Sequence, residues 1–133
     1  MLFEQWAKRN NAFFSGLVIP NVFGPFGNPY YNSVISTFCY QLTHNEQPKI
    51  DVDAEIKLIY VNDLVHIILN NIDNFKNKIN SPLETIYIQP TATIYVSKLL
   101  EKLISFKDNY FTNGIVPCLD NSFERNLFNT FVC

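Results

Sequence analysis

Residues 12–42 read AFFSGLVIPNVFGPFGNPYYNSVISTFCYQL, and this stretch contains the pattern that decides the fold. Ala12 to Ile19 is a short apolar run without charge, as expected of a strand buried on both faces of an α/β sheet. Pro20 to Pro29 holds three Pro, two Gly and two Asn, a composition typical of a loop. Asn32 or Ser33 can then cap a helix. The inner face of that helix would carry Val34, Ile35, Phe38, Cys39 and Leu42.

Strand and helix signals alternate through most of the chain. Residues 2–7 have the apolar spacing of an amphipathic helix, which at the very start of the chain would continue something upstream. The other expected elements are strands over 55–61 and 84–88, a polar connector over 70–82, a turn over 89–93, and helices starting near Asn62 or Asp63, near Ser97 and around 123–131. The alternation favours an α/β architecture with largely parallel strands. Three or four strands make a thin, incomplete sheet, so we expect this chain to form one side of a larger α/β protein.

The composition excludes several classes of protein. The 133 residues are 47% hydrophobic and 17% charged, which is typical of a globular chain. A net charge of −2 without a basic cluster argues against a nucleic-acid partner. No apolar run approaches the roughly 18 residues of a membrane helix, so no membrane association is expected. Glu4, Lys8 and Arg9 interrupt the stretch where a signal peptide needs its apolar centre, so we expect a cytoplasmic chain.

The sequence lacks the motifs that would make it a complete enzyme. Only Gly24 and Gly27 lie close together, whereas a dinucleotide-binding turn needs three clustered glycines before a helix. None of the seven tyrosines has a Lys four positions later, the nearest approach being Tyr95 with Lys98. We therefore predict no catalytic residue and no cofactor site within this chain.

The cysteines favour neither a disulfide framework nor a metal site. Cys39, Cys118 and Cys133 are odd in number, widely spaced and without a Cys-x-x-Cys pair. Reduced thiols without a functional role are the simplest interpretation, and we predict no metal ligands.

Three segments together resemble the extended short-chain dehydrogenase/reductase superfamily. They are LVIPNVFGPFG (17–27), PYYNSVISTFCYQL (29–42) and IYVNDLVHIIL (59–69). Members of that superfamily have a strand followed by Asn-Val-Tyr-Gly-Pro or a near variant, then a helix, then a Val-Asp-Asp-Val-like step from strand to helix. Residues 21–25 and 61–64 match these elements in order and spacing. PNVFG followed by YNS and TFCYQ is most similar to the capsular-polysaccharide UDP-sugar reductases.

The resemblance implies a function for a longer protein of which residues 1–133 are the substrate-binding region. Such enzymes have a Rossmann-like fold, use NAD or NADP, and in this subfamily reduce a UDP-activated N-acetylated deoxy sugar and carry a cupin domain. Their dinucleotide fold and Tyr/Lys pair lie in the N-terminal part, so the isolated chain is expected to be inactive. We expect a homo-oligomer or pairing with the missing N-terminal half. The alternative is a non-catalytic binding or assembly module from a truncated reading frame.

The resemblance also implies which residues bind the substrate. Asn21 corresponds to the motif Asn that faces the sugar nucleotide in related enzymes, and an amide can both donate and accept a hydrogen bond. Tyr30, Tyr31, Asn32 and Ser33 would lie near the same cleft. Alternatively, Asn21 satisfies backbone groups of the loop, while Asn32 or Ser33 caps the helix and one tyrosine packs in the core.

Two departures concern the charges of the site. The arginine that many members carry before the motif Asn is absent around Val18 and Ile19, and Asn62 replaces the first acid of the Asp-Asp pair. By the resemblance, both departures remove charges that are often associated with anchoring the nucleotide or the loop.

Overall fold

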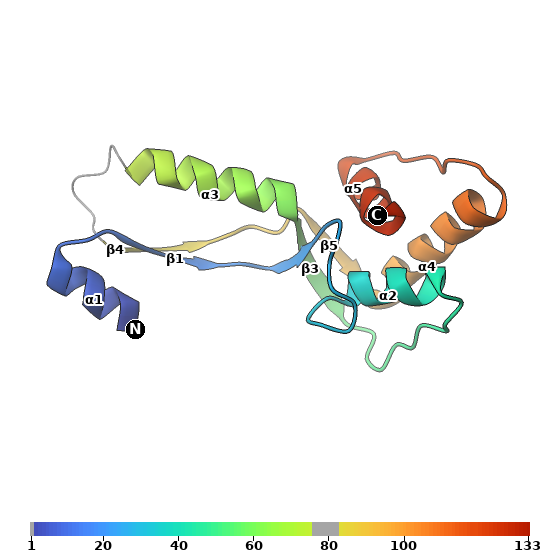
Figure 1. Ribbon diagram of the computed structural model, residues 1–133, viewed down its shortest axis with the longest axis horizontal. Coiled ribbons are helices and arrows are strands. Elements are labelled where there is room, and N and C mark those ends of the chain that lie inside the picture. The colour runs from blue at the N-terminus through green and yellow to red at the C-terminus, as the bar shows by residue number, and fades with distance from the viewer. Residues whose placement is uncertain (1, 76–82) are drawn as a thin grey trace.

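The computed structural model describes residues 2–75 and 83–133, in which helices flank two small sheets (Figure 1). The strands are β1 (Phe14–Val18), β2 (Asn21–Phe23), β3 (Glu55–Tyr60), β4 (Leu83–Tyr87) and β5 (Ala92–Tyr95). The helices are α1 (Leu2–Asn10), α2 (Val34–Thr43), α3 (Val61–Phe75), α4 (Val96–Phe106) and α5 (Ser122–Val132), with a π-helix, η1 (Lys107–Thr112), continuing α4.

The two sheets differ in their pairing. β1 and β4 form a two-stranded parallel sheet in which Phe14 is opposite Leu83 and Val18 opposite Tyr87. In the second sheet β3 is central, parallel to β2 and antiparallel to β5. The expected parallel arrangement therefore holds for two of these three pairings, and β5 is the exception.

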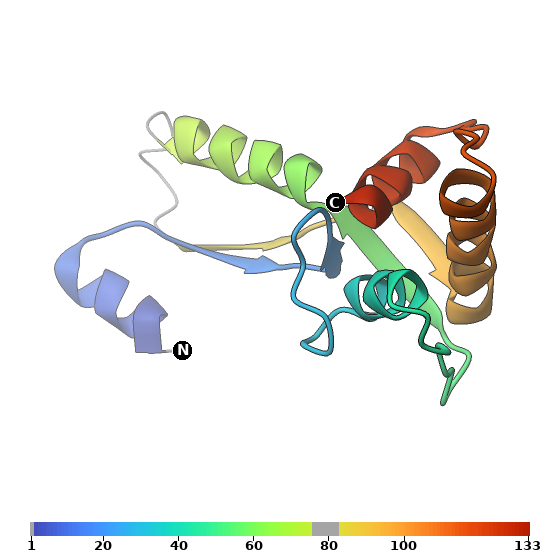
Figure 2. The same cartoon turned by 45° about the vertical axis from the view of Figure 1, so that its right-hand side comes forward.

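The two sheets extend in different directions from the start of α3. In Figure 1 the β1–β4 pair reaches toward one end of the molecule with α3 along it, and α1 lies at that end. Figure 2 shows α2, α4 and α5 gathered around the β2–β3–β5 sheet at the other end. The larger core lies between these three helices and the sheet.

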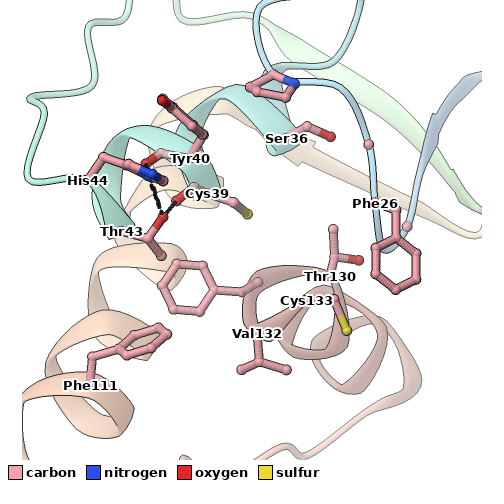
Figure 3. A pocket seen from close by; sticks show the side chains of 14 residues that line it. Phe26, Ser36, Cys39, Tyr40, Thr43, His44, Phe111, Thr130, Val132 and Cys133 are labelled. Carbon is pink, nitrogen blue, oxygen red and sulfur yellow. Dashed lines mark hydrogen bonds between the residues drawn. The ribbon is translucent and has the colours of Figure 1, made fainter.

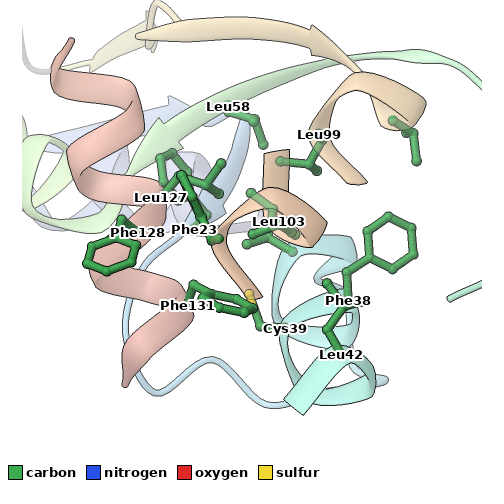
Figure 4. Close-up of a cluster of buried hydrophobic side chains, with 13 residues drawn as sticks. Phe23, Phe38, Cys39, Leu42, Leu58, Leu99, Leu103, Leu127, Phe128 and Phe131 are labelled. Atoms are coloured by element: carbon green, nitrogen blue, oxygen red, sulfur yellow. The ribbon is translucent and has the colours of Figure 1, made fainter. Parts of the chain in front are cut away.

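The apolar stripes predicted for α2 and α4 form much of this core (Figure 4). Leu99, Leu103 and Leu127 are completely buried and face Leu58 from the sheet. Figure 4 also shows Phe23, Phe38, Cys39, Leu42, Phe128 and Phe131 converging on this space. A separate, smaller cluster of Ile59, Leu64 and Ile88 joins α3 to the β1–β4 pair.

The end that carries α1 is much less buried. β1 is the strand predicted over 12–19, but its residues are only partly buried, so the expectation of burial on both faces is wrong for this structure. On α1 the only buried residue is Ala7, and Trp6 is 58% exposed. The accessible surface is 8971 Å², against roughly 7,000 Å² for a compact chain of this mass. The excess fits an α/β layer whose outer faces have no partner among the described residues.

Several predicted boundaries need correction. β2 lies within the predicted loop 20–29 and β5 overlaps the predicted turn 89–93, because both strands are very short and gain their hydrogen bonds from β3. β3 passes directly into α3, so Asn62 and Asp63 lie in its first turn instead of capping it. α3 also runs to Phe75, into the predicted connector, whose residues 76–82 lie outside the described part of the chain.

Two kinds of feature are absent from the described ranges. Within residues 2–75 and 83–133, no helix has both the length and the apolar character needed to cross a bilayer. The same residues contain no group of three or more His, Cys, Asp or Glu side chains placed to hold a metal ion.

Candidate functional site

The loop between β2 and α2, residues 24–33, contains most of the predicted site residues and packs closely against two helices. A Cβ on Gly24 would collide with the Val61 side chain at the start of α3. A Cβ on Gly27 would collide with Ser36 Oγ on α2. Both glycines are therefore required for the close approach of the loop to its neighbours.

Three residues of this loop have a left-handed backbone. Phe26, Tyr30 and Asn32 have φ values of 62°, 61° and 52°. Asn tolerates this region, whereas bulky aromatic residues rarely adopt it. Such conformations persist only where surrounding contacts hold them, and they concentrate at functional sites.

Three adjoining cavities surround the loop, and we call them together the loop cleft. Their volumes are about 220, 590 and 260 Å³, and Asn32 and Ser33 line all three. Asn21 lines the first, Tyr30 the second and Tyr31 the third. The structure thus brings all five predicted site residues around one cleft.

Asn21 and Ser33 already have structural hydrogen bonds. Asn21 lies on β2, and its Nδ2 donates to the Lys57 carbonyl of β3 at 3.3 Å. Ser33 is the N-cap of α2, where its Oγ accepts from the Ser36 N–H at 3.2 Å. These bonds match the alternative roles considered for both residues. Among residues 2–75 and 83–133, no hydrogen-bond partner is present for Asn21 Oδ1 or for the Ser33 hydroxyl proton.

Asn32 and Tyr31 make fewer side-chain hydrogen bonds than the other predicted site residues. Neither side chain makes a hydrogen bond within the described ranges, and Tyr31 is 69% exposed. An Asn amide without internal partners offers donors and an acceptor in one plane, which suits a ligand rich in oxygens. Of the two amides, Asn21 thus has a backbone partner, whereas Asn32 has none among the described residues.

Tyr30 is held by its neighbours. Its N–H donates to Thr37 Oγ1 at 2.9 Å, and its hydroxyl donates to Glu46 Oε2 at 2.5 Å. Its ring meets the edge of Tyr40, with centroids 5.7 Å apart. The hydrogen bond to Glu46 raises the pKa of Tyr30, because the carboxylate needs the phenolic proton.

One wall of the cleft is absent from the sequence-based prediction. Lys49, Ile50, Asp51 and Val52, in the connection between α2 and β3, line the 590 Å³ cavity with Gln41. No local pattern in this polar connection indicates a binding role. Only the folding of the connection back over α2 places it there.

The cleft carries little net charge. Its charged lining residues within the described ranges are Lys49 and Asp51, which pair at 3.4 Å and are largely exposed. Arg9 lies on α1 and Arg125 on α5, and neither lines the cleft. The missing arginine noted in the sequence therefore has no replacement among these lining residues.

A further cavity of about 280 Å³ lies between α2 and α5 (Figure 3). Its lining includes Tyr40 and Thr43 of α2, His44 at the C-cap of α2, Phe111 of η1 and Val132 of α5. None of the five predicted site residues lines this cavity.

A family comparison places much of the sequence in a known class of protein. Residues 1–84 match the NAD dependent epimerase/dehydratase family. The matched segment includes the whole loop 24–33 and the step from β3 to α3. The chain belongs to this family, and its α/β fold with an incomplete sheet is the one that the sequence predicts.

Individual relatives include a UDP-sugar reductase and a capsular polysaccharide assembling protein. A UDP-2-acetamido-2,6-beta-L-arabino-hexul-4-ose reductase of Pseudomonas aeruginosa is 32% identical over 115 residues, which are 86% of this chain and 30% of that protein. The capsular polysaccharide assembling protein CapF of Staphylococcus aureus matches 98% of this chain and 36% of its own, with a TM-score of 0.76 and 29% identity. The chain thus spans about a third of these relatives, and the predicted similarity to capsular reductases is confirmed.

A more distant structure shares the fold. The UDP-N-acetylglucosamine 4-epimerase of Methanobrevibacter ruminantium, determined with UDP-N-acetylmuramic acid, matches with a TM-score of 0.70 and 20% identity. The match covers 98% of this chain and 49% of that one.

The residues described here do not fit the dinucleotide of the family. A pyrophosphate cradle needs glycines that leave backbone N–H groups open to the ligand at the start of a helix. Gly24 and Gly27 instead pack against the side chains of Val61 and Ser36, which occupy the space next to these glycines.

Proposed function

We propose that this chain is the nucleotide-sugar-binding part of an NAD(P)-dependent 4-reductase or epimerase of capsular or surface polysaccharide biosynthesis. Its substrate would be a UDP-activated N-acetylated deoxy sugar. The observation that carries this proposal is the convergence of Asn21, Tyr30, Tyr31, Asn32 and Ser33 on the loop cleft. The names of the Pseudomonas and Staphylococcus relatives support the same substrate class and pathway.

The lining chemistry suits a sugar nucleotide. The Asn32 amide and Asn21 Oδ1 can bind hydroxyl, acetamido or phosphate oxygens and their protons. Tyr30 and Tyr31 present exposed ring faces, and an aromatic ring can stack on a base or on the apolar face of a sugar. In this proposal the chain binds and orients the substrate.

The chemical step would require residues outside this chain. Proton transfer to a sugar carbonyl needs a positioned acid, commonly a tyrosine whose pKa is lowered by a neighbouring lysine. None of the tyrosines has a Lys four positions later, and the pKa of Tyr30 is raised, which is the opposite of what such an acid needs. Binding without that acid gives no turnover.

Calorimetric titration with UDP-N-acetylglucosamine tests the proposal, using Asn32→Gly as the diagnostic variant. Glycine removes the amide and tolerates the left-handed backbone, so we expect roughly tenfold weaker binding with unchanged stability. Asn11→Gly is the matched control, because Asn11 has a φ of 51° and lies outside the cleft. Absence of wild-type binding at millimolar ligand would exclude the proposal, as would equal effects of the two variants.

A further inference from the structure

The left-handed conformation of Tyr30 requires a physical explanation. Its φ of 61° is unfavourable for a bulky side chain and is retained only if contacts outweigh the strain. Its contacts include Thr37 Oγ1 at its N–H, the Tyr40 ring at its ring and Glu46 at its hydroxyl, where the Gln41 side chain also forms a hydrogen bond. The first two come from α2, which directly follows the loop.

Glu46 is different because it belongs to another loop. It lies in residues 44–54, which connect α2 to β3, and its N–H donates to the Gln41 carbonyl at 2.8 Å. This bond fixes the Glu46 backbone at the end of α2, so the carboxylate can reach the Tyr30 hydroxyl. Among the described residues, no other hydrogen bond joins residues 24–33 to residues 44–54.

The two joined loops both line the 590 Å³ cavity. Tyr30, Asn32 and Ser33 come from one, and residues 49–52 come from the other. The second loop is also fixed at its far end, where Asp53 accepts two hydrogen bonds from Ser97. The Tyr30–Glu46 bond therefore links the two loops at the end nearer to α2.

We propose that Glu46 is a positioning residue of the substrate cleft: by accepting a hydrogen bond from Tyr30 it holds that side chain, and the wall that carries Asn32, in the geometry that binds the sugar nucleotide. This inference rests on the proposed function of the loop cleft. Glu46 itself does not line the cavity, so it acts through Tyr30. A hydrogen bond to an ionised carboxylate is stronger than a neutral one, and it can offset the strained backbone of Tyr30.

A double-mutant cycle tests the proposal in the full 133-residue chain, with UDP-N-acetylglucosamine as the probe. Glu46→Ala and Tyr30→Phe each remove the same bond, so each should weaken binding about fivefold. The double variant should bind no worse than either single variant. Glu46→Gln keeps an acceptor oxygen and should retain most of the affinity. Glu101→Ala is the control, because Glu101 pairs with Lys98 on the exposed face of α4.

A spectroscopic measurement on the same variants reports the bond without ligand. The pKa of Tyr30 is raised chiefly by its hydrogen bond to Glu46, so its titration by Cζ-labelled tyrosine NMR should move to lower pH in Glu46→Ala. A general loss of structure would not move this one resonance selectively. Far-UV circular dichroism checks that each variant is folded. If Glu46→Ala does not fold, Tyr30→Phe still tests the loss of the same hydrogen bond.

The outcomes separate this inference from the proposed function. If the wild type binds the probe and Glu46→Ala and Tyr30→Phe bind it with the same affinity, the positioning role is overturned. The proposed function is then left intact. Additive losses in the double variant would overturn it as well. Absence of wild-type binding would overturn the proposed function, and the positioning role with it.

Discussion

Asp53 caps helix α4 from a distant point in the sequence: its carboxylate accepts hydrogen bonds from the Ser97 N–H at 2.9 Å and the Ser97 hydroxyl at 2.8 Å. The residue at the N-cap position of α4, Tyr95, makes no side-chain capping bond. The connection between α2 and β3 thus supplies the cap that the helix lacks, and the same contact fixes one wall of the loop cleft.

The Asp53 cap should make stability depend on pH. Hydrogen bonds from the Ser97 N–H, and then from its hydroxyl, lower the pKa of Asp53 in the folded protein. The stabilisation is therefore present above the pKa of the unfolded state and is lost as the pH falls through the lower folded value. The free energy of unfolding measured in urea should be lower for Asp53→Ala than for the wild type at neutral pH. The two values should converge at about pH 2. Asp51→Ala, which loses only an exposed pair with Lys49, should track the wild type throughout.

Shortening a side chain of α4 should destabilise the protein strongly only on the face of the helix that is buried in the core. Leu103 is completely buried, so Leu103→Ala should lower the free energy of unfolding by about 2–5 kcal/mol through lost burial and a cavity. Ile104, the next residue on the same helix, is 40% exposed, and Ile104→Ala should cost less than about 1 kcal/mol. Chemical denaturation measures both. Equal losses would contradict this one-sided packing.

The close approach of the loop to α2 should depend on Gly27. Gly27→Ala places a methyl group against Ser36 Oγ, and overpacking of this kind should destabilise the protein by about 1–3 kcal/mol. Replacing Ser36 with Ala in the same chain removes the colliding oxygen and leaves Ser36 Cβ, 3.1 Å from the added methyl carbon, as the nearest contact. Thermal unfolding should therefore show that the double variant Gly27→Ala/Ser36→Ala regains part of the stability that Gly27→Ala loses. A double variant no more stable than Gly27→Ala would show that this contact is not the cause.

The three thiols should differ in reactivity. Burial raises the pKa of Cys39 to about 12, so its thiolate is scarce, whereas Cys118 and Cys133 are exposed. A thiol-specific disulfide reagent at about pH 8 should label Cys118 and Cys133 in the native protein and all three cysteines in urea. Cys118 should react more slowly than Cys133, because its hydrogen bond to Asp120 raises its pKa. Rapid native labelling of Cys39 would contradict its burial.

The raised pKa of the Cys39 thiol also predicts that the folded protein loses stability at alkaline pH. Its folded pKa of about 12 lies above the value of 9.0 expected without burial. The unfolded chain therefore releases this proton first, and stability should fall as the pH rises between these two values. Cys39→Ser avoids thiol ionisation and should flatten this part of the stability profile.

The loop motif and the helices were predictable because their signals are local. The spacing of Ile35, Phe38 and Leu42 indicates one buried helix face, and Ser33 caps that helix as expected. The family resemblance likewise rests on contiguous residues. β2 and β5 were not predictable, since strands this short have no periodicity of their own and exist through pairing with β3.

The candidate site shows the same division. The motif residues were predicted together, but their hydrogen-bond partners were not: Asn21 has a backbone partner on β3, and Asn32 makes no side-chain hydrogen bond within the described ranges. The wall formed by residues 49–52 carries no motif and was missed. Its place depends on contacts that Glu46 and Asp53 make with residues far away in the sequence.

By itself, the sequence determined the class of fold, the family and the segment that carries the site, because hydrophobic period, capping and turn chemistry act over a few neighbouring residues. Tertiary structure decided which amide is available, how the two loops meet and which apolar faces stay exposed. Those features depend on pairing and packing between segments distant along the chain, and no local pattern encodes such contacts.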